Sequence, residues 1–215
     1  MVELRKRKAS AQPNITGTKK RGKKEEIPSS SRQTGKTSNT TNADSLTGVP
    51  NIGDTVILDG FGGEIQTNDG ARTNLKELVA TSKSGVVLFT YPKASTPGCT
   101  KQACMFRDKY SHLTSTGLSI YGLSTDSPKA NTTFRSKQTL PYPLLCDTSA
   151  VLISAIGYKK APKGTIRGVF SVDKQGKVLL RQAGGPDATV DAVQKLVQVE
   201  GTPKTDVETQ TKNEN

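Results

Sequence analysis

The sequence predicts an α/β fold with a mixed central sheet flanked by helices, and three observations support this. The apolar, β-branched run from Gly85 to Thr90 is typical of a strand that is buried on both faces. A helical pattern follows it, with apolar residues at spacings of three and four: Ala103, Phe106, Tyr110 and Leu113. Two alternating segments, residues 167–173 and 177–181, predict an antiparallel hairpin beside these strand–helix units.

Shorter elements complete the predicted fold. Residues 56–58 and 64–67 are expected as strands around a glycine-rich turn, and residues 75–78 as a short helix. Residues 117–124 alternate as a strand does, and Ser127 before Pro128 marks a helix start. A short helix should end at Gly157, and an amphipathic helix should cover residues 189–199. The glycines between residues 60 and 63 follow no G-x-G-x-x-G pattern, so we assign them to turns rather than to a phosphate site.

The two ends of the chain differ in composition from its middle. The first 48 residues carry eleven Lys or Arg and four Asp or Glu, which gives a net charge of +7 out of +12 for the 215-residue chain. They contain almost no large apolar residues, so we expect residues 1–48 to be a disordered basic tail. Residues 49–200 are enough for one domain with a single core, and residues 201–215 are expected to be a flexible tail.

Two basic clusters in the N-terminal tail have the spacing of a two-cluster nuclear import signal. They consist of Arg5, Lys6, Arg7 and Lys8, and of Lys19, Lys20, Arg21, Lys23 and Lys24. The acidic groove of an import carrier would bind such extended clusters, so the sequence predicts a nuclear protein, with the cytoplasm as the alternative location. The other interpretation is a solvated tail that aids solubility or contacts nucleic acid nonspecifically.

Composition excludes several classes of protein. Three cysteines, an odd number, argue against a secreted disulfide framework and for a reducing compartment. No apolar run approaches the roughly 18 residues of a membrane span, and no signal-peptide core is present. Because the three cysteines and one histidine show no paired spacing, we expect no metal site.

Cys99 is the candidate nucleophile. Ser95 or Thr96 can cap the predicted helix and Pro97 can occupy its first position, which places Cys99 in the first turn. The free N–H groups and positive dipole end of a helix favour an anion there, and the thiolate is the nucleophilic form of cysteine. Taken alone, the residue is better explained as a small apolar side chain packed near a helix start, and the flanking residues reverse this preference.

The residues around Cys99 resemble the active-site segment of a known family. The string Tyr91-Pro92-Lys93-Ala94-Ser95-Thr96-Pro97-Gly98-Cys99-Thr100, followed by Gln102-Ala103-Cys104 and Phe106-Arg107-Asp108, is similar to that of the peroxiredoxin Q, or bacterioferritin-comigratory, branch of the thiol peroxidases. The resemblance spans roughly residues 50–199, and the basic extension makes the chain most similar to fungal nuclear members. It implies a thioredoxin-like fold.

The resemblance also implies a role for each site residue. Cys99 would be the peroxidatic nucleophile and Cys104 the resolving cysteine. Pro92 and Thr96 would shape the pocket and bind the peroxide. Arg167, followed by alternating apolar residues on a later strand, would complete the pocket. Without the resemblance, Arg167 reads as a surface arginine on a strand.

The implied activity is reduction of hydrogen peroxide and alkyl hydroperoxides through a Cys99 sulfenic acid. An intramolecular disulfide with Cys104 would follow, and thioredoxin or a similar dithiol would reduce it. No cofactor is needed, and we expect a monomer. If both cysteines share one regular helix, their Cα atoms lie about 8.7 Å apart, too far for a disulfide. We therefore expect the first turns of that helix to unwind on oxidation.

Other functions fit less of the sequence. A redox sensor or disulfide reductase on the same fold is disfavoured because a Cys-x-x-Cys pair is missing. A non-enzymatic chromatin-associated protein would explain the basic tail, but the remainder shows no basic stripe interleaved with aromatic residues, so specific nucleic-acid binding is not expected. A cysteine protease or acyl transferase needs a histidine, and His112 lies about 20 Å along the predicted helix from Cys99. Cys146 matches no catalytic position and is expected to be a buried structural thiol.

Overall fold

A computed structural model describes residues 48–200 of the chain. The predicted disordered tail, the two basic clusters and the C-terminal tail lie outside these residues. Within residues 48–200, no helix is both long enough and apolar enough to cross a membrane.

The described residues form a seven-stranded sheet with the strand order β2-β1-β5-β4-β3-β6-β7. Strands β3, β4 and β5 are parallel to one another, while β1 and β6 pair with their neighbours in the antiparallel sense. The sheet is therefore mixed, as predicted. The strands are β1 (Ile65–Thr67), β2 (Arg72–Thr73), β3 (Gly85–Thr90), β4 (Leu118–Ser124), β5 (Leu144–Cys146), β6 (Gly168–Asp173) and β7 (Val178–Ala183).

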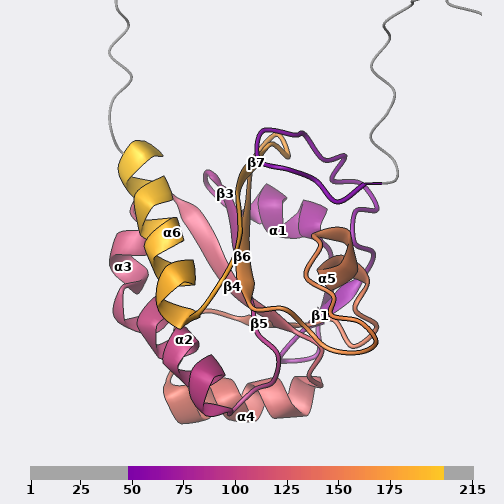
Figure 1. Ribbon diagram of the computed structural model, residues 1–215, viewed down its shortest axis with the longest axis vertical. Helices are drawn as coiled ribbons and strands as arrows, with labels where there is room; N and C mark the ends of the chain where they lie inside the picture. The colour runs from indigo at the N-terminus through magenta and orange to yellow at the C-terminus, as the bar shows by residue number, and fades with distance from the viewer. Residues whose placement is uncertain (1–47, 201–215) are drawn as a thin grey trace, which may run out of the picture. The chain divides into compact units, whose positions relative to one another are not determined.

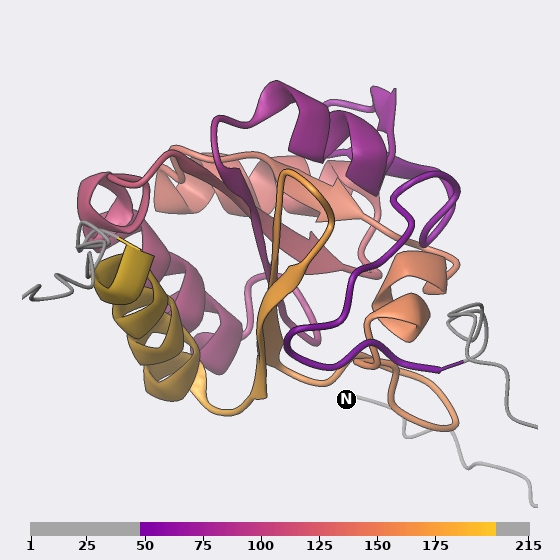
Figure 2. The ribbon, with the colours of Figure 1, turned by 90° about the horizontal axis from the view of Figure 1, so that it is seen from above.

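Helices cover both faces of the sheet, as Figures 1 and 2 show. They are α1 (Leu75–Thr81), α2 (Pro97–Asp108), α3 (Tyr110–Leu113), α4 (Pro128–Gln138), α5 (Val151–Ala155) and α6 (Pro186–Glu200). Helices α2, α3, α4 and α6 contribute to one hydrophobic core, and α1 and α5 contribute to the other. In Figure 2, α2 and α6 lie side by side on the same face.

Strand β3 supplies side chains to both cores because successive residues of a strand point to opposite faces. Val87 and Phe89 pack in the core beneath α2 and α6, and Phe89 stacks on Phe106 of α2 with ring centroids 4.4 Å apart. Val86 and Leu88 pack in the opposite core. All six residues of the strand are buried, which confirms the prediction of a strand covered on both faces.

Three predicted elements are corrected by the structure. Residues 56–58 form no strand: only the isolated bridge from Thr55 to Lys177 is made, and Ile57 is 67% exposed. The long apolar stripe is split between two helices, because α2 ends at Asp108 and Lys109 leaves the helical conformation with φ −104° and ψ 10°. The final helix begins at Pro186 instead of residue 189, since proline is compatible with a first turn.

Candidate active site

Cys99 is the third residue of α2, as predicted. Strand β3 ends at Thr90, and the segment from Tyr91 to Thr96 leads directly into the helix. Pro97 occupies the first helical position, and the Cys99 side chain is only 1% exposed. The sequence thus places a buried thiol at the N-terminal end of a helix, just after the carboxyl end of β3.

The guanidinium of Arg167 contacts the Cys99 thiol. Its Nη2 donates to Cys99 Sγ at 3.3 Å, although 68 positions separate the two residues in the chain. Arg167 immediately precedes β6 and does not lie within the predicted strand. Gly98 permits this approach, because a Cβ at that position would lie 3.2 Å from Arg167 Nη2. The predicted nucleophile and the predicted cation are therefore in direct contact.

Gln102 binds the second terminal nitrogen of the Arg167 guanidinium. Arg167 Nη1 donates to Gln102 Oε1 at 2.6 Å, and Gln102 Nε2 donates to Thr189 Oγ1 of α6 at 3.1 Å. Thr189 in turn donates to the Pro186 carbonyl at 2.7 Å. Sequence reasoning assigned no role to Gln102, yet its position three residues after Cys99 places it on the same face of the helix. Its side chain is fully buried, so this network fixes the orientation of Arg167.

Thr96 lies at the N-cap of α2 but does not cap the helix with its side chain. Its hydroxyl instead donates to the Lys93 carbonyl at 2.9 Å, and its carbonyl accepts from Thr100 N at 2.8 Å. The predicted capping bond, in which the Thr96 hydroxyl would accept from a backbone N–H of the first turn, is absent. Pro92, the remaining predicted pocket residue, is exposed just after β3.

Cys104 lies on the same helix as Cys99. It is half-buried, and its Sγ is 3.5 Å from Gln138 Oε1 at the end of α4. Nearby, the Tyr142 hydroxyl donates to the Ala103 carbonyl at 2.6 Å. Both cysteines are free thiols in this state. The middle of α2 is thus held against α4 and the segment before β5.

A buried polar network lies behind the active-site segment, and the sequence analysis did not anticipate it. Asp126 Oδ2 accepts from Ala94 N at 2.7 Å and from Ser124 Oγ at 3.0 Å. Asn131 Nδ2 donates to Ser124 Oγ at 3.3 Å, and its Oδ1 accepts from the Tyr91 hydroxyl at 2.8 Å. Burial raises the pKa of Tyr91, so its hydroxyl remains a donor. The only signals in the sequence were polar residues at the end of one strand and the start of the next helix.

Cys146 is buried in β5, as predicted, and is 3% exposed. Asn131 Nδ2 donates to its Sγ at 3.2 Å. Burial raises the pKa of the Cys146 thiol, and the hydrogen bond from Asn131 opposes this effect. The side chain is therefore a neutral, packed thiol.

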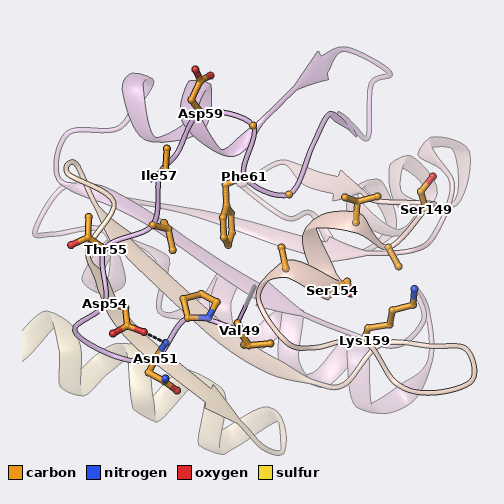
Figure 3. Close-up of a pocket in the computed structure, with 18 residues that line it drawn as sticks. Val49, Asn51, Asp54, Thr55, Ile57, Asp59, Phe61, Ser149, Ser154 and Lys159 are labelled. Atoms are coloured by element: carbon orange, nitrogen blue, oxygen red, sulfur yellow. Dashed lines mark hydrogen bonds between the residues drawn. The ribbon is translucent and has the colours of Figure 1, made fainter. Parts of the chain in front are cut away.

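Two other features lie apart from this site. His112 is exposed on α3. A pocket of about 970 Å³ lies between the segment that precedes β1 and α5, and Phe61 points into it (Figure 3). None of the predicted catalytic residues lines this pocket. Among residues 48–200, no three His, Cys, Asp or Glu side chains gather as ligands for a metal ion.

Solved structures share this fold. Peroxidoxin BcpB from Mycobacterium tuberculosis is 31% identical and superposes with a TM-score of 0.63, over 69% of this chain and 96% of that one. The bacterioferritin comigratory protein of Xanthomonas campestris is 25% identical with a TM-score of 0.61, over 68% of this chain and 98% of that one. The predicted thioredoxin-like fold is therefore confirmed.

The sequence comparisons agree with the structural ones. Peroxiredoxin bcp1 of Schizosaccharomyces pombe is 44% identical over 98 residues, which make up 46% of this chain and 49% of that protein. The chain spans 49–66% of the length of the three curated relatives that share 44% identity with it. A model of the AhpC/TSA family matches residues 61–181. The chain therefore belongs to the AhpC/TSA family and, within it, to the peroxiredoxin Q or bacterioferritin-comigratory branch.

Proposed function

We propose that this protein is a thiol-dependent peroxidase that reduces hydrogen peroxide and alkyl hydroperoxides with Cys99 as its nucleophile. The observation that carries the proposal is the 3.3 Å contact between Arg167 Nη2 and Cys99 Sγ in the first turn of α2. A guanidinium is always charged, so it stabilises negative charge on the sulfur, whereas a thiol buried for packing alone needs no such partner. Alkyl peroxide reduction by the Xanthomonas protein, which has the same fold, supports the proposal.

In the proposed first step, the Cys99 thiolate attacks one oxygen of the peroxide. An S–O bond forms as the O–O bond breaks, so Cys99 is oxidised to a sulfenic acid, and the departing oxygen takes up a proton to leave as water or an alcohol. Arg167 and the N-terminal end of α2 stabilise the charge on the departing oxygen. The Thr96 hydroxyl donates to Lys93, which leaves its lone pairs free to accept from the peroxide while the Cys99 N–H orients the oxygens. Pro92 limits the access of bulk water.

In the second step, the Cys104 thiol condenses with the sulfenic acid. An S–S bond forms and water leaves, and an external dithiol such as thioredoxin then reduces the disulfide by exchange. The external dithiol supplies both electrons, so the protein itself needs no cofactor. The two cysteines are too far apart in the intact helix, so this step requires α2 to open.

The test is a coupled assay that follows NADPH loss in the presence of thioredoxin, its reductase and hydrogen peroxide. Cys99→Ser should abolish turnover. Cys104→Ser should consume about one equivalent of peroxide per protein and then stall when no small-thiol reductant is present, because one thiolate reduces one peroxide. Cys146→Ser is the matched control and should retain turnover. Rapid peroxide consumption by the Cys99→Ser variant would overturn the assignment.

We also propose that the two basic clusters direct the protein to the nucleus. Support comes from the sequence alone, because both clusters precede the described residues. Deletion of residues 1–26 should leave peroxidase activity intact and abolish nuclear accumulation of a fluorescent fusion. A deletion variant that still accumulates in the nucleus would assign the tail to solubility or nonspecific nucleic-acid contact instead.

A further inference from the structure

We propose that Asp126 is a positioning residue for the peroxide-binding turn, residues 93–96, which it holds in the conformation that presents Thr96 to the substrate. This inference rests on the proposed peroxidase function, because it assigns a role to Thr96 in binding peroxide. Asp126 itself would touch neither the peroxide nor the Cys99 sulfur. It would act through the backbone of Ala94.

Asp126 contacts the turn directly. Asp126 Oδ2 accepts from the Ala94 amide at 2.7 Å, a short bond that joins the segment after β4 to the segment after β3. Because β3 and β4 are parallel neighbours, their carboxyl ends meet at the same edge of the sheet. The carboxylate is therefore placed by the sheet itself and is independent of α2.

The Asp126–Ala94 bond maintains an unusual backbone conformation at the next residue. Ser95 follows Ala94 and has φ +61°, the left-handed region that residues other than glycine rarely adopt. The turn closes where the Thr96 hydroxyl donates to Lys93 O at 2.9 Å. If the Ala94 amide lost its acceptor, the turn could relax to a conformation with negative φ at Ser95, and the Thr96 hydroxyl would move.

Asp126 is itself held in place by hydrogen bonds to Ser124. Ser124 Oγ donates to Asp126 Oδ2 at 3.0 Å and accepts from Asp126 N at 3.2 Å, and Ser124 is fully buried. Asn131 links Ser124 to the Tyr91 hydroxyl, which fixes the start of the same active-site segment. Both Tyr91 and Ala94 are thus anchored to one polar cluster.

The Cys99–Arg167 contact has a separate support. Arg167 is oriented by Gln102 and Thr189 on α2 and α6, none of which contributes to the Asp126 cluster. Loss of Asp126 should therefore impair binding of the peroxide through Thr96 while the Cys99 thiolate keeps its cation. These two effects can be measured separately.

The experiment measures two rate constants for Cys99, one with hydrogen peroxide and one with iodoacetamide, which does not need Thr96. Asp126→Ala should lower the peroxide rate constant by about tenfold or more, the effect of losing a hydrogen bond to a charged group. Its alkylation rate should stay within about twofold of the wild type, since Arg167 is undisturbed. Asp126→Asn retains an acceptor oxygen and should recover most of the peroxide rate.

A second variant tests the link to Ser95. Because glycine adopts positive φ freely, Ser95→Gly in the Asp126→Ala background should restore part of the lost peroxide rate. Thr139→Gly is the matched control: Thr139 has φ +51° at the end of α4, so the substitution relieves the same kind of strain outside the turn and should restore nothing.

Three outcomes would overturn the inference. An unchanged peroxide rate in Asp126→Ala would remove the positioning role, and a parallel fall in both rates would show a general structural role instead. Equal rescue by Ser95→Gly and Thr139→Gly would show that global stability, rather than the turn, was restored. An unreactive wild-type protein would instead overturn the proposed function, so the two failures are distinguishable.

Discussion

Cys99 and Cys104 lie five residues apart on one uninterrupted helix, and both are free thiols. Regular helical geometry separates their Cα atoms by about 8.7 Å, whereas a disulfide needs Cα atoms within about 7 Å and converging Cβ vectors. The Cys104 thiol also contacts Gln138 of α4. The helix seen here therefore belongs to the reduced state, and the disulfide state requires a different conformation of α2.

Hydrogen exchange should detect this change. In the reduced protein, amides between Thr100 and Asp108 should be protected by the helix, and formation of the intramolecular disulfide should remove much of that protection. Amides of α1 serve as the internal control, because that helix packs in the core on the opposite face of the sheet from α2. Equal protection of α2 in both redox states would contradict the prediction.

Tyr142 should control how readily α2 opens. Its hydroxyl donates to the Ala103 carbonyl at 2.6 Å, and burial raises its pKa, so the bond is present throughout the usable pH range. Tyr142→Phe should lower the free energy of unfolding by about 1 kcal/mol. The variant should form the Cys99–Cys104 disulfide faster, so that less Cys99 sulfenic acid remains to be over-oxidised at high peroxide concentration.

Tyr158→Phe is the matched control for this prediction. Tyr158 also donates a buried hydrogen bond to a carbonyl, that of Val169 at 2.8 Å, but it packs in the core on the opposite face of the sheet from α2. The substitution should cost a similar stability and leave the rate of disulfide formation unchanged. A similar acceleration by both variants would show that stability in general, rather than the Ala103 contact, governs opening.

The Arg167 network should behave as a unit. Arg167→Ala should slow both alkylation and peroxide reduction by Cys99 at neutral pH, because it removes the cation 3.3 Å from the sulfur. Gln102→Ala should cause a smaller loss, about tenfold in the peroxide rate, and little further loss when combined with Arg167→Ala. The comparison is Lys101→Ala, which breaks only an exposed ion pair with Asp187 and should change the rate less than twofold. Additive effects of the first two substitutions would place Gln102 outside the network.

Cys146 should resist alkylation in the folded protein. Burial raises its pKa, so a smaller fraction is thiolate at a given pH than for an exposed cysteine, and its sulfur is paired with the neutral amide of Asn131, whereas the guanidinium of Arg167 contacts Cys99. At pH 8, iodoacetamide should therefore label Cys99 first and Cys146 only when denaturant unfolds the chain. Mass spectrometry of the labelled peptides gives the order directly, and early labelling of Cys146 would refute it.

Local signals made the centre of the fold predictable. The apolar run of β3, the proline at the start of α2 and the serine at the start of α4 each act within a few residues, so the sequence alone locates them. The predicted strand at residues 56–58 was wrong, because β-branched residues form a strand only where a neighbouring strand pairs with them along their whole length. Here the ladder is reduced to one bridge at Thr55.

The sequence predicted those parts of the candidate site that depend on neighbouring residues, and it did not predict contacts between residues far apart in the chain. The position of Cys99 follows from the strand–turn–helix pattern, whereas the contact with Arg167 depended on a family resemblance, because the pairing of β3 with β6 brings the two together. The Asp126–Ala94 bond joins two loops that meet only after β3 and β4 have paired. No periodic pattern in the sequence predicts a contact between these two loops.

The antiparallel pairing of β3 with β6 has a consequence for the growing polypeptide on the ribosome. Thr90, at the end of β3, is paired with Gly168, at the start of β6, and this register sets Arg167 beside Cys99. A nascent chain that has emerged only as far as α5 contains the cysteine without its cation and without the last strands of the sheet. At about 5–20 residues per second, the ribosome needs several seconds to add the 68 residues from Cys99 to Arg167. During that interval the Cys99 sulfur has no guanidinium beside it, so we expect the order of the strands to delay its reactivity toward peroxide until most of the domain has been made.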